Sequence, residues 1–468
     1  MGRTSHRFGS VRRIASIVVL LGAALAGCVA TPPPPQADRA PIPLRLVALN
    51  DFHGQLEPGG LTLRLRDPGD PSRMLNVGAG GAAQLGTLVR RLRAEVPNTL
   101  VVSAGDLVGA TPIASALFRD EPTVEVMNLI GVDLGAVGNH EFDRGFAELR
   151  RLIAGGCHPG DASPAGSCAG PDGTFRGARF PMLAANVRDS AGRAVLPASI
   201  VREVGGVKVA FIGAVLRATP TVVVPAGVAG LVFEDEADAV NREVARLKAS
   251  AGIEAFVAVI HEGGAIDGDW NDARCPGARG PIFAIADRLR PEVDAVLSGH
   301  SHLGYACLRD APGNPRLPVV QAFANGRAVS VVDLQLDPAT GDVLRARTVA
   351  RNLPVANGLG GDRAADAAYP PLPPDPAVRA IVEHYAARAK PLAERPVGRI
   401  AVAATRDPSP GGDTPLGRLV ADAHLSATRS PDRGGARLAL TNPGGMRADL
   451  RCDAGPCEVR YADAFAAQ

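Results

Sequence analysis

Histidine, aspartate and asparagine side chains gather at five places in the sequence, and each place directly follows a short apolar run. The side chains that could bind a metal ion there are Asp51, His53, Asp106, Asn139, His261, His300 and His302. Carboxylate, amide and imidazole ligands without a cysteine suit hard to borderline divalent ions. Two such ions, about 3.5–4 Å apart, polarise a phosphoryl oxygen and generate hydroxide at neutral pH. The set therefore predicts a two-ion hydrolytic centre.

The spacing of these residues supports a shared site. Asp51 and His53 are separated by one residue, as are His300 and His302. In an extended segment, the two side chains of such a pair point to the same face and can hold one ion. Asp106 follows Gly105, so little bulk crowds a carboxylate that could bridge two ions.

Each of these residues taken singly has another interpretation. An aspartate after a strand often caps the next helix. His261 could be a hydrogen-bonded core histidine, and His300 and His302 could line a turn. The distribution of histidine favours a site, because five of the nine histidines lie in these clusters. They are His53, His140, His261, His300 and His302.

The five apolar runs are typical of buried strands. They lie at residues 44–49, 99–103, 134–137, 256–260 and 295–297. Amphipathic stretches of helical period lie between them, at residues 83–94, 146–154, 235–248 and 282–289. Strands that alternate with helices indicate an α/β layered fold, in which ligands collect beyond the carboxyl ends of the strands. We therefore expect the polar clusters to share one pocket.

A second unit follows a stretch rich in Gly, Ala and Pro at residues 352–376 and a predicted helix at 377–389. It contains a predicted strand at 438–440 that runs into Asn442-Pro443-Gly444-Gly445-Met446-Arg447. About 70 residues are few for a domain with a full core, so we expect this unit to be incomplete. The predicted parts are a signal peptide (1–28), a Pro/Ala-rich tether (29–43), a catalytic domain (44–351), a linker with a connecting helix (352–395) and an incomplete second domain (396–468).

The N-terminal leader predicts export. A basic segment ends at Arg13 and precedes an apolar run at residues 14–26, which is too short for a comfortable membrane span. The run closes on Leu25-Ala26-Gly27-Cys28, which resembles a bacterial lipobox. We expect a protein of the cell envelope or periplasm, anchored to a membrane through lipidated Cys28. The alternative is an ordinary secretory signal with a chance cysteine.

The charged residues disfavour a nucleic-acid polymer as partner. The 468-residue chain has 50 basic and 48 acidic residues, a formal net charge of +2. The arginines are scattered among acids and form no basic stripe, which a nucleic-acid-binding surface would need. The sequence says nothing of the oligomeric state.

Six cysteines remain when Cys28 is set aside, an even number that favours disulfides in an exported chain. Pairing them in sequence order gives Cys157–Cys168, Cys275–Cys307 and Cys452–Cys457. This is one of fifteen possible connectivities.

The motifs resemble those of a known family. The segments Asp51-Phe52-His53, Gly105-Asp106, Gly138-Asn139-His140-Glu141, His261 and Gly299-His300-Ser301-His302 are similar to those of calcineurin-like metallophosphoesterases. Together with Phe142-Asp143 and the segment from Asn442 to Arg447, they resemble the two-domain 5′-nucleotidase family. The resemblance implies a four-layer α/β sandwich, with helices on two packed sheets. A smaller α/β nucleotide-binding domain would follow, truncated here.

The resemblance also implies roles for individual residues. One ion would be bound by Asp51, His53, Asp106 and His302, and a second by Asp106, Asn139, His261 and His300. The two divalent ions would be Zn, Mn, Co or Mg. His140 would stabilise the transferring phosphoryl group or protonate the leaving oxygen, with Asp143 holding its imidazole. Asn442, Arg447 and Arg406 would contact the substrate.

The function implied by the resemblance is release of phosphate from nucleoside 5′-monophosphates by a metal-held hydroxide. Two alternatives use the same metals with other leaving groups: UDP-sugar hydrolysis, and 2′,3′-cyclic-nucleotide phosphodiesterase with 3′-nucleotidase activity. A non-catalytic surface binding protein on the same fold is a further alternative. The presence of every implied ligand and of His140 disfavours that last alternative.

Overall fold

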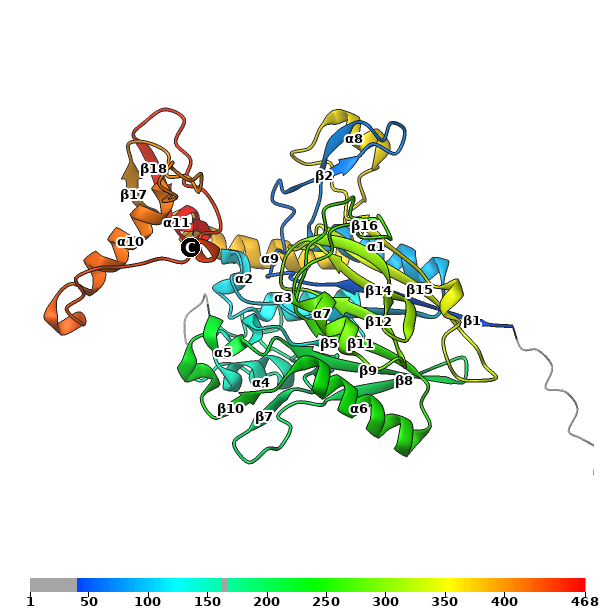
Figure 1. Cartoon of the computed structure of the whole chain (residues 1–468). Coiled ribbons are helices and arrows are strands. Elements are labelled where there is room, and N and C mark those ends of the chain that lie inside the picture. The colour runs from blue at the N-terminus through cyan, green and yellow to red at the C-terminus, as the bar shows by residue number, and fades with distance from the viewer. Residues whose placement is uncertain (1–39, 161–165, 468) are drawn as a thin grey trace, which may run out of the picture. The chain divides into compact units, whose positions relative to one another are not determined.

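A computed structural model describes residues 40–160 and 166–467 of the chain (Figure 1). The predicted signal peptide, Cys28 and the tether up to residue 39 lie outside the described residues. No helix within the described ranges is both long and apolar enough to cross a membrane.

The first of two large sheets carries three of the predicted strands. Its order is β16 (Val349–Pro354), β15 (Ala328–Leu336), β1 (Ile42–Leu49), β4 (Thr99–Ala104), β5 (Leu134–Ala136) and β6 (Met182–Leu183). The strands β1, β4, β5 and β6 run parallel, whereas β15 is antiparallel to β1. Because β1, β4 and β5 are parallel neighbours, the residues that follow them meet at one edge of the sheet.

The second sheet carries the other two predicted strands. Its order is β13 (Gly304–Ala311), β14 (Asn314–Ala322), β12 (Val293–Ser298), β11 (Ala255–His261), β9 (Val207–Val215) and β8 (Ser199–Val204). The strand β11 is parallel to both β9 and β12. The residues after β11 and β12 therefore also meet at a single edge.

The two sheets pack face to face and carry helices on their outer faces, as Figure 1 shows. Residues of β1 face the two sides of the first sheet. Leu44 and Leu46 lie in the core between the two sheets, and Val47 and Leu49 lie in the core between the first sheet and its helices, here called the outer core. The helices α1 (Ala82–Glu95), α3 (Glu121–Ile130) and α4 (Phe146–Ala154) contribute to that outer core, while α6 (Glu236–Ala251) and α7 (Pro281–Arg288) cover the second sheet. This arrangement confirms the four-layer α/β sandwich.

The predicted connection between the units is partly built into the catalytic fold. The strand β16 extends to Pro354, and Val355 is fully buried in the outer core. The helix α8 (Arg363–Ala368) lies beside the hairpin of β2 (Thr62–Arg66) and β3 (Met74–Gly78). The helix α9 (Pro376–Ala393) covers the predicted helix at 377–389 and packs on α1, α3 and α2 (Ile113–Ala116).

The second unit is small, and one of its predicted elements is wrong. It contains β17 (Pro396–Ile400) paired with β18 (Cys457–Arg460), together with α10 (Pro415–Thr428) and α11 (Tyr461–Ala467). Residues 438–440 form no strand, and Leu438 and Leu440 are exposed. Within the described ranges no neighbouring strand pairs with this segment, so its alternating apolar residues have no sheet to join.

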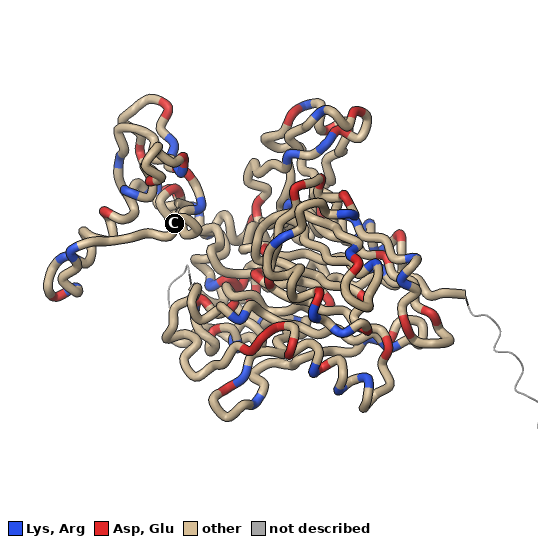
Figure 2. Tube along the Cα trace, viewed as in Figure 1, with Lys and Arg blue, Asp and Glu red and all other residues tan. Residues whose placement is uncertain are grey.

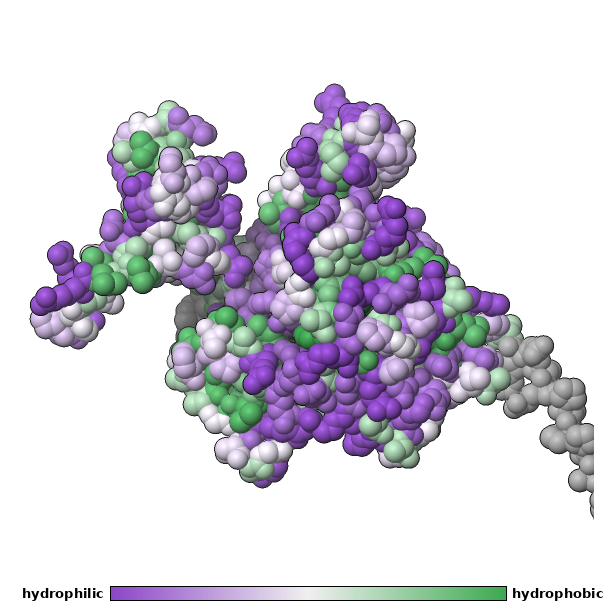
Figure 3. Space-filling view, viewed as in Figure 1, coloured by the Kyte–Doolittle hydropathy of each residue, from purple (hydrophilic) through white to green (hydrophobic). Residues whose placement is uncertain are grey.

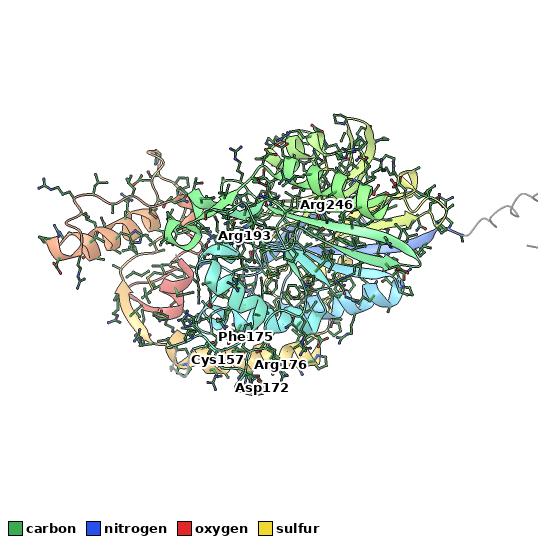
Figure 4. The ribbon with its side chains drawn as sticks, turned by 90° about the horizontal axis from the view of Figure 1, so that it is seen from below. Cys157, Asp172, Phe175, Arg176, Arg193 and Arg246 are labelled. Atoms are coloured by element: carbon green, nitrogen blue, oxygen red, sulfur yellow. A yellow bond between two sulfur atoms is a disulfide. The ribbon has the colours of Figure 1, made fainter. Side chains whose placement is uncertain are left out.

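The three predicted disulfides are present: Cys157–Cys168, Cys275–Cys307 and Cys452–Cys457. The first follows α4, where the Gly156 N–H donates to the Phe175 carbonyl oxygen at 2.8 Å. Figure 4 shows Cys157 near Phe175 and Arg176. Further along the chain, β7 (Val187–Asp189) and β10 (Leu231–Phe233) form a two-stranded antiparallel sheet.

The core between the sheets should dominate the stability of the catalytic fold. Leu46 is completely buried there, so we expect Leu46→Ala to lower the free energy of unfolding by about 2–5 kcal/mol through lost contacts and a cavity. Leu129→Ala is the matched control, because Leu129 on α3 is 46% exposed and its truncation should cost far less. Urea unfolding of both variants measures the change in the free energy of unfolding. Equal losses would contradict this assignment of the core.

Candidate active site

The structure brings the seven candidate ligands together where the carboxyl ends of β1, β4 and β5 face those of β11 and β12. The ligand atoms of six of them, together with those of His140, fall into three overlapping groups, each within 4.8 Å. The groups are Asp51, His53 and His302; His53, Asp106 and His140; and Asp106, His261 and His300. Asp106 and His53 each belong to two groups. One centre is therefore built from both sheets.

The backbone at the centre is held in an unusual conformation. Five candidate ligands have positive φ angles, a region that non-glycine residues seldom occupy. They are Asp51 (48°), His53 (47°), Asp106 (52°), His300 (71°) and His302 (59°). Such angles persist only where surrounding contacts fix them, and they turn these side chains away from the strand direction into the shared space.

Hydrogen bonds between the loops supply those contacts. The Asp51 N–H donates to the Gly105 carbonyl at 3.0 Å, and the His53 N–H donates to the Asp106 carbonyl at 3.0 Å. The His300 N–H donates to the Asp51 carboxylate at 2.9 Å. Asp51 thus links the loop after β1 to the loops after β4 and β12, and so joins the two sheets.

Two imidazoles are oriented by carbonyl groups. His53 Nδ1 lies 2.8 Å from the Gly109 carbonyl oxygen, and His261 Nδ1 lies 2.7 Å from that of Ala104. A carbonyl oxygen only accepts, so Nδ1 carries the hydrogen in each ring and Nε2 offers its lone pair to the centre. This is the arrangement expected of histidine ligands to a metal.

The unpaired atoms of the centre fit divalent cations. Asn139 Oδ1 and His261 Nε2 are buried without a hydrogen-bond partner. His261 Nε2 lies only 3.0 Å from Asp106 Oδ2, but the two atoms are not aligned for a hydrogen bond. Similarly, the Nε2 atoms of His53 and His302 lie 3.0 Å apart. Ligand atoms that converge in this way suit an ion that accepts lone pairs from all of them.

The pKa shifts of two histidines at the centre also fit a site for divalent cations. Burial lowers the pKa of His53 to about 4, which keeps its imidazole neutral as a ligand must be. Burial also acts to lower the pKa of His261, but the negative charge of Asp106 outweighs it and raises that pKa to about 10. The carboxylates therefore attract positive charge strongly, and divalent ions would satisfy them in place of the proton.

Glu141 is a functional residue to which the sequence analysis assigned no role. Its buried carboxylate accepts hydrogen bonds from the backbone N–H groups of Asp106 at 2.9 Å and of Leu107 at 2.8 Å. It also accepts from the Gly138 N–H. The side chain therefore ties the loop after β4 to the loop after β5. No spacing or periodicity marks such a role, although Glu141 directly follows His140.

His140 and Asp143 form a hydrogen-bonded pair beside the candidate ligands. His140 Nδ1 lies 2.7 Å from Asp143 Oδ2, and the His140 ring centroid lies 5.1 Å from that of His53. Gly109 packs closely on the pair, because a Cβ built on Gly109 would lie 2.4 Å from His140 Cβ. Burial acts to lower the pKa of His140, but the hydrogen bond to Asp143 and the charge of Asp106 raise it above its usual value.

The centre opens into a cavity of about 530 Å³ that residues of the second unit also line. Arg406 and Arg447, for which substrate contact stays a prediction, are among them, and so is Phe465 on α11. Arg406 is fixed by hydrogen bonds to the Asp449 carboxylate (3.0 Å) and the Arg447 carbonyl (2.9 Å). The third predicted substrate residue, Asn442, lines an adjoining cavity instead. The sequence predicted no role for Phe465, because this residue lies far along the chain from the metal-binding motifs and only the fold brings it to the cavity.

Comparison with known proteins identifies the family. The calcineurin-like phosphoesterase model matches residues 44–170, and the 5′-nucleotidase C-terminal domain model matches residues 396–468. An uncharacterized protein of Acinetobacter calcoaceticus is 43% identical over 175 residues, which are 37% of this chain and 84% of that protein. The chain belongs to the 5′-nucleotidase family of calcineurin-like phosphoesterases. It is accordingly a metal-dependent phosphoric ester hydrolase.

Other members of the family differ in extent. Endonuclease YhcR of Bacillus subtilis is 33% identical over 419 residues, which are 88% of this chain but only 30% of YhcR. The crystal structure of the 5′-nucleotidase precursor from Thermus thermophilus has a TM-score of 0.64 at 23% identity, covering 91% of this chain and 73% of that one. The similarity to the Thermus thermophilus structure supports the fold of this chain. The chain spans less than a third of YhcR, so the activity of that whole protein is not carried over.

Asp106 should be indispensable for metal binding, because its carboxylate lies at the overlap of two ligand groups. We expect Asp106→Asn to reduce bound metal and to lower turnover by at least about 100-fold. Elemental analysis and phosphate release measure the two effects. Asp287→Asn is the control, because Asp287 pairs with Arg309 on the outer surface. Retention of full metal content by Asp106→Asn would contradict the assignment.

The His140–Asp143 pair should set the basic limb of the pH–rate profile. Asp143 raises the pKa of His140, so the imidazolium persists to higher pH than in an isolated histidine. Asp143→Asn removes that charge, and we expect the basic limb to move to lower pH while turnover at the optimum falls about tenfold. Steady-state rates of the natural chain and of Asp143→Asn, measured across the pH range, test this prediction. An unchanged basic limb would show that His140 does not act as the acid.

Proposed function

We propose that this chain hydrolyses nucleoside 5′-monophosphates to a nucleoside and phosphate. The observation that carries the proposal is the composition of one cavity. The cavity is lined by His140 and by two of the candidate metal ligands, His53 and His302. It is also lined by two arginines, Arg406 and Arg447, and by an aromatic ring, Phe465. A nucleotide needs these three kinds of group: cations for its phosphate, an acid for its leaving oxygen and a flat apolar surface for its base.

The assigned residues divide the work as follows. Asp51, His53, Asp106 and His302 would hold one divalent ion, and Asp106, Asn139, His261 and His300 would hold a second. Divalent ions at such a centre polarise phosphoryl oxygens and lower the pKa of bound water. Zn, Mn, Co and Mg are the candidates.

The chain's own acid completes the reaction. His140 donates a proton to the departing 5′-oxygen, and its charge stabilises the phosphoryl group during transfer. Asp143 holds the imidazole with Nδ1 turned away from the substrate, because that nitrogen is the one bonded to the carboxylate. The guanidinium groups of Arg406 and Arg447 offer paired donors to the substrate's oxygens.

We further propose that the protein is exported and anchored to a membrane through Cys28. The three disulfides support an oxidising compartment, since such bonds are rare in cytosolic proteins. Metabolic labelling with a fatty acid, compared between the natural chain and Cys28→Ser, tests the anchor. Equal labelling of the two would reject it.

A second candidate function is cleavage of nucleic-acid phosphodiesters, which the name of the relative YhcR brings forward. Figure 2 shows basic and acidic residues interspersed over the described chain. A long polyanion is usually held by clustered positive charge, so this distribution favours a small substrate. UDP-sugars and 2′,3′-cyclic nucleotides are the other small candidates, and they differ from a nucleoside monophosphate in the leaving group.

The experiment that tests the proposal measures phosphate release from the monoester substrates of a panel, and it separates the products of the other substrates by chromatography because their cleavage frees no inorganic phosphate. Metal-free protein is reloaded with manganese, zinc, cobalt or magnesium and given AMP, UDP-glucose, 2′,3′-cyclic AMP, single-stranded DNA or an aryl phosphate. We expect AMP to have the highest kcat/KM, and removal of the metal to abolish release. A higher value for any other substrate would replace the proposed function with that one.

The variant His140→Ala tests the assignment of His140 as the proton donor. Because His140 is assigned to proton donation rather than to metal binding, we expect turnover to fall by about 100-fold or more with the metal content unchanged. Loss of metal in this variant would reassign His140 as a ligand.

A further inference from the structure

Asn50 is a polar side chain buried directly before the candidate ligand Asp51, at the end of β1. Hydrophilic residues cover much of the molecular face that Figure 3 shows. Asn50, in contrast, is only 4% exposed. A polar group so far from water must find its hydrogen-bond partners inside the protein. The partners of Asn50 therefore indicate what this side chain does.

The three partners of Asn50 admit an amide in one orientation only. Its Nδ2 donates to Asp51 Oδ2 at 2.6 Å and to the Phe323 carbonyl oxygen at 2.6 Å. Its Oδ1 accepts from the Ala322 N–H at 2.9 Å. A carboxylate and a carbonyl only accept, whereas an N–H only donates, so an ionised aspartate could not replace this amide. Asn50 thus joins Asp51 to the end of β14, a strand that carries none of the seven candidate ligands.

These bonds make the two oxygens of Asp51 unequal. Oδ2 accepts from Asn50, and a Cβ built on Gly299 would lie 3.0 Å from it, so backbone closes this side. The His300 N–H is shared between the two oxygens, at 2.9 Å from Oδ2 and 3.0 Å from Oδ1. Oδ1 lies 3.3 Å from His302 Nε2. The arrangement leaves Oδ1 as the oxygen that faces a neighbouring ligand.

The same end of β14 holds the loop that carries His302. The buried Gln321 side chain donates through Nε2 to the Leu303 carbonyl oxygen at 2.9 Å. The Phe323 N–H donates to that carbonyl as well, at 3.1 Å. Ligands from the two sheets are therefore attached to one strand end, through Asn50 on one side and through residues 321–323 on the other.

We propose that Asn50 is a positioning residue for one of the two ions. It turns Asp51 so that Oδ1 faces the ion, and it fixes that oxygen at the distance from His302 that the end of β14 sets. Asn50 acts through Asp51 and does not bind the ion itself, because its own oxygen is turned to the Ala322 N–H. The inference rests on the two-ion centre of the proposed function.

The effect of Asn50 should fall on one ion more than on the other. Asp51 is assigned to the ion that His302 also binds, and it is not among the ligands assigned to the second ion. Side chains that hydrogen-bond to a metal ligand typically contribute 10- to 100-fold to metal affinity. Loss of the Asn50 amide should therefore weaken one of two binding steps.

Asn186 provides a matched control for the structural part of this role. It is fully buried, and its Nδ2 donates to the carbonyl oxygens of Val215 at 2.6 Å and Glu234 at 3.0 Å. Its Oδ1 accepts from the Val215 N–H at 3.0 Å. Asn186 thus makes the same three kinds of bond as Asn50, except that both of its acceptors are backbone carbonyls and neither is a candidate ligand.

The test measures metal binding directly. The natural chain, Asn50→Ala, Asn50→Ser and Asn186→Ala are freed of metal and dialysed against increasing manganese, and elemental analysis counts the bound ions. The thermal midpoints of the metal-free forms are measured in parallel. Asn50→Ser keeps a hydroxyl in the buried space and provides the same comparison if Asn50→Ala does not fold.

We expect each Asn50 variant to raise the Kd of one ion about 10- to 100-fold and to leave the Kd of the other within about twofold. Asn186→Ala should leave both affinities unchanged. The metal-free midpoints of Asn50→Ala and Asn186→Ala should fall by similar amounts, because each variant loses three buried hydrogen bonds.

Several results would overturn the role of Asn50 while the two-ion centre stands. They are unchanged affinity for both ions, equal weakening of both ions, or the same weakening in Asn186→Ala. Failure of both Asn50 variants to fold, with Asn186→Ala folded, would make Asn50 a structural residue only. A natural chain that binds fewer than two ions would instead contradict the two-ion centre, and the inference would fail with it.

Discussion

Two buried carboxylates, Asp51 and Asp106, impose the constraint on which the rest of this structure depends. Their exposed fractions are 0% and 1%, and ionised groups so far from water must be compensated by positive charge or by donors. Backbone N–H groups meet part of the need, since His300 donates to Asp51 and His140 donates to Asp106. Divalent ions would supply the remaining positive charge, and the stability of the centre and catalysis would then depend on the same ions.

The layered fold is the means by which such a centre can be assembled. Each sheet ends in loops that hold only part of the ligand set. The first sheet carries Asp51, His53, Asp106 and Asn139, and the second carries His261, His300 and His302. The bond from His300 to Asp51 and the bond from His261 to the Ala104 carbonyl both connect the two sheets. The apolar core between the sheets therefore sets the distance between ligands, although none of its side chains touches substrate.

The sequence predicted the parts that have a local signature. Apolar runs followed by polar clusters placed Asp51, Asp106 and His261 correctly at strand ends, and helical periodicity located α4 and α6 within a few residues. What it could not show depends on contacts distant in the chain. Glu141 acts by accepting backbone hydrogens, and Phe465 reaches the cavity only through the tertiary fold. The positive φ angles were also hidden, because non-glycine residues seldom adopt them and hydrogen bonds between loops distant in the chain fix them here.

The proposed hydrolysis requires one centre of two ions, for which Asp106 would be a shared ligand. Equilibrium dialysis of metal-free protein against increasing manganese, with elemental analysis and phosphate release from AMP measured on the same samples, tests it most directly. The account predicts saturation at two ions per chain, with full activity reached only as the second ion binds. Full activity at one ion per chain, or activity that survives complete removal of metal, would contradict it.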